Sequence, residues 1–160
     1  MRTVSRTLAI TGSKHRLTVA FAGMAIAGLI SGCGAMGMGN NLAMEPAAKV
    51  SLSGAAEVPA NSSPARGSGN INVGNDHVVS GSVTTTGIDG TAAHIHLAAK
   101  GANGPVIVPL IKTAEGTWSV PAGATLTDSQ YASYVAGDTY VNVHSVAMPA
   151  GEIRGQLSPK

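Results

Sequence analysis

Three histidines are the side chains of this sequence whose types and spacing could do chemistry. His94 and His96 are two residues apart in an alternating segment, residues 93–97 (AHIHL), so their rings would point to the same face of a strand. Their Cα atoms would then lie roughly 6.6–7 Å apart, a spacing at which two imidazoles can converge on one ion with metal–nitrogen bonds of about 2.0–2.1 Å. His144 ends a second alternating segment, residues 139–144 (TYVNVH). If the two strands are neighbours, the three rings predict a metal site.

The type of ligand narrows the choice of ion. A site made of imidazoles alone favours copper, with zinc as the second choice, over calcium or magnesium. Arg154 lies on the polar side of residues 152–157 (EIRGQL), where it could bind an anion near the metal or form a surface pair with Glu152. The plainer alternative is that the histidines are solvent-facing residues on polar strand faces and hold no ion.

The rest of the chain must supply the strands that position these rings. About eight short runs rich in β-branched or alternating residues are separated by Gly, Asn, Asp and Pro, which predicts an all-β fold, an antiparallel Greek-key-like sandwich. Residues 74–76 suit a hairpin turn. One short helix is expected after Thr127, because Thr127 and Gln130 fit a capping box and Gly137 can end the helix. His77, after the predicted turn, is expected at the surface, and Glu57 either in an exposed loop or in a salt bridge.

The first 32 residues have the layout of a secretory signal. Four basic residues precede a 14-residue uncharged apolar run, residues 17–30, which is shorter than the ~20 residues of a membrane-spanning helix. Residues 30–33 (ISGC) resemble the lipobox of bacterial lipoproteins, in which the cysteine is acylated and becomes the new N-terminus. That resemblance implies lipidation of Cys33, the sole cysteine, and anchoring in the cell envelope. Gly34 after the cysteine implies the outer membrane where the cell has one.

Residues 33–47 are expected to be a flexible lipidated tether, followed by the β-domain at residues 48–160. Met36, Met38 and Met44 could offer thioether ligands to Cu(I), or simply reflect tether composition. Removing residues 1–32 leaves six basic and eight acidic residues, a formal net charge of −2. The basic excess therefore belongs to the signal and gives no reason to expect nucleic-acid binding.

Five sequence blocks resemble the CHRD domain family, named after repeats in chordin. In order along the chain they are residues 52–59 (LSGAAEVP), 93–96 (AHIH), 101–106 (GANGPV), 140–144 (YVNVH) and 149–157 (PAGEIRGQL). The resemblance implies a single CHRD domain over roughly residues 48–158. The role of chordin in growth-factor signalling does not transfer to a bacterial lipoprotein.

A weaker likeness is to the copper half of copper–zinc superoxide dismutases, which are also β-sandwiches. It implies His94, His96 and His144 as copper ligands and Arg154 as a residue that steers superoxide. A bridging histidine, a histidine-rich zinc loop and a disulfide are missing. We therefore expect a copper-binding module with no assigned catalytic residue, and keep two alternatives: a dismutase-like copper enzyme and a metal-free structural or adhesive surface domain. A protein partner is not identified.

Overall fold

The computed structural model describes residues 47–158 of the chain. The predicted signal peptide, Cys33 and the three tether methionines lie outside these residues. Within residues 47–158 there is no helix long and apolar enough to cross a membrane.

The described residues form nine strands, one α-helix and one short 3₁₀ turn. The elements, in chain order, are β1 (Ala48–Ser53), η1 (Gly54–Ala56), β2 (Arg66–Val73), β3 (Val79–Thr86), β4 (Gly90–Leu97), β5 (Val106–Pro109), β6 (Ile111–Ala114), β7 (Thr117–Ser119), α1 (Asp128–Val135), β8 (Thr139–Ser145) and β9 (Ile153–Leu157). The prediction of an all-β fold with one short helix is confirmed.

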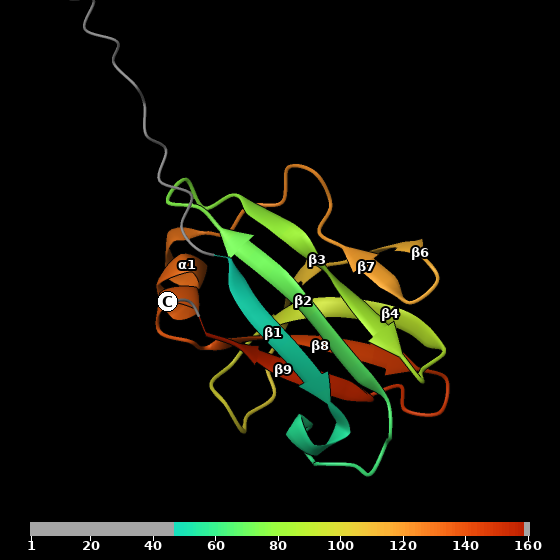
Figure 1. Cartoon of the computed structure of the whole chain (residues 1–160). Helices are drawn as coiled ribbons and strands as arrows, with labels where there is room; N and C mark the ends of the chain where they lie inside the picture. The colour runs from blue at the N-terminus through green and yellow to red at the C-terminus, as the bar shows by residue number, and fades with distance from the viewer. Residues whose placement is uncertain (1–46, 159–160) are drawn as a thin grey trace, which may run out of the picture. The chain divides into compact units, whose positions relative to one another are not determined.

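The strands form one antiparallel sheet that folds back on itself. Their order is β5-β4-β8-β9-β1-β2-β3-β7-β6, and Figure 1 shows β1, β2 and β3 crossing in front of β4 and β8. The two end strands, β5 and β6, are consecutive in the chain, with only Leu110 between them. The Leu110 amide donates a hydrogen bond to the Ala93 carbonyl of β4. The sheet is therefore nearly closed, because one stretch of chain pairs with β4 first and with β7 after this corner.

This corner explains the difference between the eight predicted runs and the nine strands. Residues 105–111 read as a single apolar run in the sequence, but the chain changes pairing partner at Leu110, so the run divides between β5 and β6. A strand that bends from one layer to another in this way is common in orthogonally packed sheets.

Small aliphatic side chains fill the space between the two layers. Val83 of β3, Val141 and Val143 of β8 and Ile153 of β9 are completely buried, and each lies on the inward side of an alternating strand. Trp118 of β7 is the single tryptophan of the chain and packs in the same cluster. The inward positions of β4 and β8 thus anchor those strands and leave their histidines on the opposite face.

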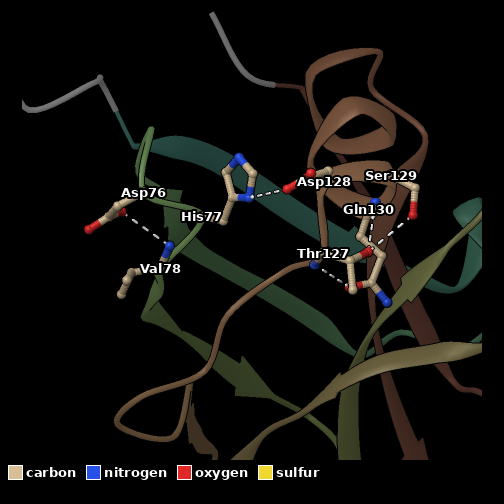
Figure 2. A network of polar contacts seen from close by, with 7 residues as sticks. All are labelled: Asp76, His77, Val78, Thr127, Asp128, Ser129 and Gln130. Atoms are coloured by element: carbon tan, nitrogen blue, oxygen red, sulfur yellow. Dashed lines mark hydrogen bonds and ion pairs between the residues drawn. The ribbon is translucent and has the colours of Figure 1, made fainter.

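The helix begins and ends where the sequence predicts. The Thr127 hydroxyl accepts a hydrogen bond from the Gln130 amide, and the Gln130 side chain accepts one from the Thr127 amide, which makes a complete capping box (Figure 2). Gly137, at φ +80°, follows the helix. His77 lies at the start of this helix, 3.5 Å from the Asp128 carboxylate and stacked on Tyr131 with ring centres 4.3 Å apart. His77 therefore links the turn before β3 to α1 and is not part of the histidine cluster of β4 and β8.

Candidate metal centre

Pairing between β4 and β8 brings the three predicted ligands together. The register places His96 opposite Tyr140, His94 opposite Asn142 and Ala92 opposite His144, so all three imidazoles are on the outward face of two neighbouring strands. One ring nitrogen of each histidine lies within 4.8 Å of one nitrogen of each of the others. The His94 Nδ1 and His144 Nε2 atoms are 3.1 Å apart. The condition that the strands be neighbours is met.

Backbone carbonyls fix the orientation of two of the rings. His96 Nδ1 lies 2.9 Å from the Gly104 carbonyl oxygen, and His144 Nδ1 lies 3.0 Å from the Pro149 carbonyl oxygen. Because a carbonyl only accepts, each Nδ1 must carry the proton, which leaves the lone pair of both neutral rings on Nε2. Metal-binding histidines typically donate their second ring N–H to a carbonyl or carboxylate in this way.

The free nitrogens that result face the centre of the cluster. His96 Nε2 is buried and has no hydrogen-bond partner, an arrangement that leaves a desolvated lone pair unsatisfied. His144 Nε2 can only accept, so His94 Nδ1 donates a proton to it across the 3.1 Å contact. An ion bound at this point would replace that proton, which would move to Nε2 as His94 changes to its other neutral tautomer. The donor set for a metal is then Nδ1 of His94 with Nε2 of His96 and of His144.

The surroundings favour the neutral form of His94 and of His96. Burial lowers the pKa of His94 below its ordinary value, and the charges of His144 and His96 act in the same direction. Burial also lowers the pKa of His96; the hydrogen bond to Gly104 opposes this shift, while His144 and Arg154 add to it. Since only unprotonated imidazole binds a metal, the lowered pKa values of His94 and His96 favour ion binding at mildly acidic pH.

Arg154 lies behind the cluster instead of beside it on the surface. The guanidinium carbon is 3.4 Å from the centre of the Tyr140 ring, and the other face of that ring stacks on His96, with centres 4.8 Å apart and planes 9° apart. Arg154 is 1 % exposed. The expected surface pair with Glu152 is wrong: the Glu152 carboxylate accepts hydrogen bonds from the Ser63 and Ser145 hydroxyls. Anion binding by Arg154 stays a prediction, for a side chain that is now seen to be buried.

Loops bury this face of the sheet. Asn103 donates a hydrogen bond to the Val58 carbonyl and accepts one from Arg154, which links the two loops that cover β8 and β9. Glu57 is buried at 8 % exposure and accepts a hydrogen bond from the Asn142 side chain. Of the two alternatives for Glu57, the exposed loop charge is therefore wrong, and no salt bridge to Glu57 is found among the described residues. Burial raises the pKa of Glu57, and Arg154 partly opposes that shift.

The residues that support the ligands were not predicted from the sequence. Tyr140, Gly104 and Pro149 appeared there only as parts of the blocks that match the family. Every residue type has a backbone carbonyl, so the role of the Pro149 carbonyl as a hydrogen-bond acceptor could not be predicted from the sequence. Gly104 had a weak signal: a Cβ there would lie 1.8 Å from the Leu97 carbonyl oxygen, so glycine is required.

Comparison with known proteins identifies the class of the domain. The sequence model of the CHRD domain matches residues 48–157, which include every strand, the helix and all three histidines. The chain belongs to the CHRD domain family. No curated protein and no solved structure matches it.

Proposed function

We propose that this protein is a lipid-anchored cell-envelope lipoprotein whose CHRD domain binds a copper ion through His94, His96 and His144. The observation that carries the proposal is the orientation of the rings. Three imidazoles from two strands bring ring nitrogens close to a common point, and carbonyls of two separate loops hold the Nδ1 protons of His96 and His144, which leaves both Nε2 lone pairs free for a metal. Solvent-facing histidines without a ligand would have no need of such support.

The donor set favours copper among the available ions. It offers three neutral nitrogens and, among the described residues, no carboxylate or thiolate that joins the cluster. Imidazole donors suit copper and zinc, and a given nitrogen site binds divalent copper more tightly than divalent zinc. Zinc is therefore the competitor to measure.

Metal binding is tested on the full chain purified in detergent. We expect one copper per chain after loading and desalting, and more than ten-fold weaker binding in His144→Ala, as expected when one of three ligands is removed. His77→Ala is the matched control, because this histidine is engaged with Asp128 and Tyr131 elsewhere. Equal copper binding by parent and His144→Ala would refute the site. If the parent binds neither copper nor zinc, the metal-free structural alternative stands.

The anchoring half of the proposal depends on Cys33. Its support is the match of residues 30–33 to a lipobox behind a basic and apolar leader. Cells grown with labelled palmitate should incorporate the label into the parent, and the protein should sediment with membranes. Cys33→Ala should lose both properties; label retained by that variant would contradict lipidation at this residue.

Turnover is a separate question for the same preparation. Superoxide dismutation by the copper-loaded chain, lost in His144→Ala, would favour the dismutase-like alternative. No described residue is assigned a catalytic role.

A further inference from the structure

A buried positive charge lies behind the proposed copper site and forms no close ion pair with any described residue. The Arg154 guanidinium contacts two neutral acceptors, Asn103 Oδ1 at 3.2 Å and Gln156 Oε1 at 3.4 Å. Among residues 47–158 no carboxylate lies within ion-pair distance of it. A buried charge without an ion pair destabilises a fold relative to an apolar side chain of similar size. Its position next to a cation site therefore calls for a functional reason.

The Tyr140 ring fills the space between the Arg154 guanidinium and the His96 ligand, so no water lies between them. The flat ring is packed between the guanidinium on one face and the His96 imidazole on the other. Adding the two stacking distances puts the guanidinium carbon no farther than about 8 Å from the His96 ring centre, a range at which charges interact appreciably across protein. Water cannot enter the stack, so the charge is screened less than one at the surface.

A fixed positive charge discriminates between ions of different charge. At equal distance it repels a divalent cation twice as strongly as a monovalent one. The three ligands are neutral imidazoles, so they contribute no negative charge to offset that repulsion. Three donors also leave the site short of the four or more ligands of tetragonal Cu(II) complexes.

We infer that the site selects the cuprous ion over the cupric ion, and that Arg154 is the specificity-determining residue, acting through Tyr140. This inference rests on the proposed copper binding by His94, His96 and His144. Arg154 is a positioning and electrostatic residue in this account, not a ligand.

The test compares the affinity for the two oxidation states in matched variants of the full chain in detergent. Cu(I) is titrated anaerobically with ascorbate against bicinchoninate, and Cu(II) in air against nitrilotriacetate. Arg154→Met removes the charge and keeps much of the volume, whereas Arg154→Lys keeps the charge. We expect the parent to bind Cu(I) more tightly than Cu(II). The ratio of the Cu(II) to the Cu(I) dissociation constant should fall roughly ten-fold in Arg154→Met, the scale of one charge about 10 Å from the ion in a partly screened site, and stay near the parental value in Arg154→Lys.

A second variant keeps the test decisive if Arg154→Met does not fold. Glu57 interacts electrostatically with Arg154, and Glu57→Gln retains an acceptor for the Asn142 side chain. Measured at pH 8, this variant removes a negative charge that offsets Arg154, so the same ratio should rise. A ratio that stays constant or falls contradicts the inference.

The failures of the two proposals are distinguishable. If the parent binds neither Cu(I) nor Cu(II), the copper-binding function itself is wrong. If the parent binds both but prefers Cu(II), or if folded Arg154→Met leaves the ratio unchanged, copper binding stands and the cuprous selectivity is wrong.

Discussion

Gly104 provides the sharpest test of how the loop supports the metal centre. Its carbonyl accepts the His96 Nδ1 proton, and its amide donates to the Tyr140 hydroxyl at 3.3 Å. A Cβ added at this position would lie 1.8 Å from the Leu97 carbonyl oxygen. The backbone of residue 104 fixes the position of the Cβ, and the oxygen it meets belongs to the backbone of Leu97, so no side-chain rotation can relieve the clash. Gly104→Ala must therefore move the loop away from β4.

The expected displacement is enough to break the supporting hydrogen bond. Separating the new Cβ from the Leu97 oxygen to a tolerable ~3 Å requires a shift of about 1.2 Å, which stretches the His96–Gly104 contact well beyond hydrogen-bonding range. His96 is then free to rotate or to change tautomer. Loss of such an outer contact typically weakens metal affinity about 10- to 100-fold, and the overpacking should destabilise the fold by about 1–3 kcal/mol.

Gly101→Ala is the matched control, in the same loop. Gly101 has φ +85° and nothing within 4 Å of an added Cβ, so alanine introduces backbone strain of about 1 kcal/mol without a clash. Copper affinity from competition titration and stability from urea unfolding are measured for both variants. We expect weaker copper binding in Gly104→Ala and parental copper binding in Gly101→Ala. Parental copper affinity in Gly104→Ala would refute the role assigned to its carbonyl.

Three further predictions concern the rings and the helix. Burial lowers the pKa values of His94 and His96, so the unfolded chain binds more protons than the folded chain below about pH 6.5, and the metal-free domain should lose stability as the pH falls through that value. In urea unfolding, the free energy of unfolding of the double variant His94→Gln with His96→Gln should depend less steeply on pH than that of the parent. An equal pH dependence in both proteins would contradict the lowered pKa values. Tyr140→Phe keeps the stacked ring and should have a copper affinity within a few-fold of the parent, whereas the affinity of Tyr140→Leu should be about 10-fold weaker in the copper competition titration. Equal copper affinities of the two variants would show that the ring does not position His96. Thr127→Ala removes the helix cap and should lower the free energy of unfolding by about 1 kcal/mol while leaving copper binding unchanged; a change in copper affinity would show that α1 is coupled to the site.

Local signals in the sequence predicted the features that depend on local structure. The capping box at Thr127 and Gln130 needs only four consecutive residues, and the pairing of His94 with His96 needs only strand alternation. The meeting of His144 with them depended on strand order, which alternation does not encode. From the sequence, the metal site could be predicted only on the condition that the two strands are neighbours, and the β4–β8 register meets that condition.

The two wrong expectations, a surface pair of Arg154 with Glu152 and an exposed loop charge at Glu57, share one physical cause. Alternation in β8 and β9 predicted one buried and one solvent-facing side, but nearly every residue of both strands is buried. The second face is covered by the loops that carry Glu57 and Asn103, held together by the hydrogen bond of Asn103 to Val58. Polar residues under a loop look the same in a sequence as polar residues under water, so a surface pair was one alternative for Arg154 and an exposed loop charge was one alternative for Glu57.

The bend at Leu110 also bears on how this domain behaves when many copies are crowded together. An open sheet presents two rows of unpaired backbone groups, to which a strand from another molecule can add. Here the two terminal strands are successive parts of one chain segment, and the Leu110 amide is bonded to Ala93 at the junction. Each end strand keeps one unpaired edge of only 4 residues, and such short edges are poor templates for cross-molecular strand addition.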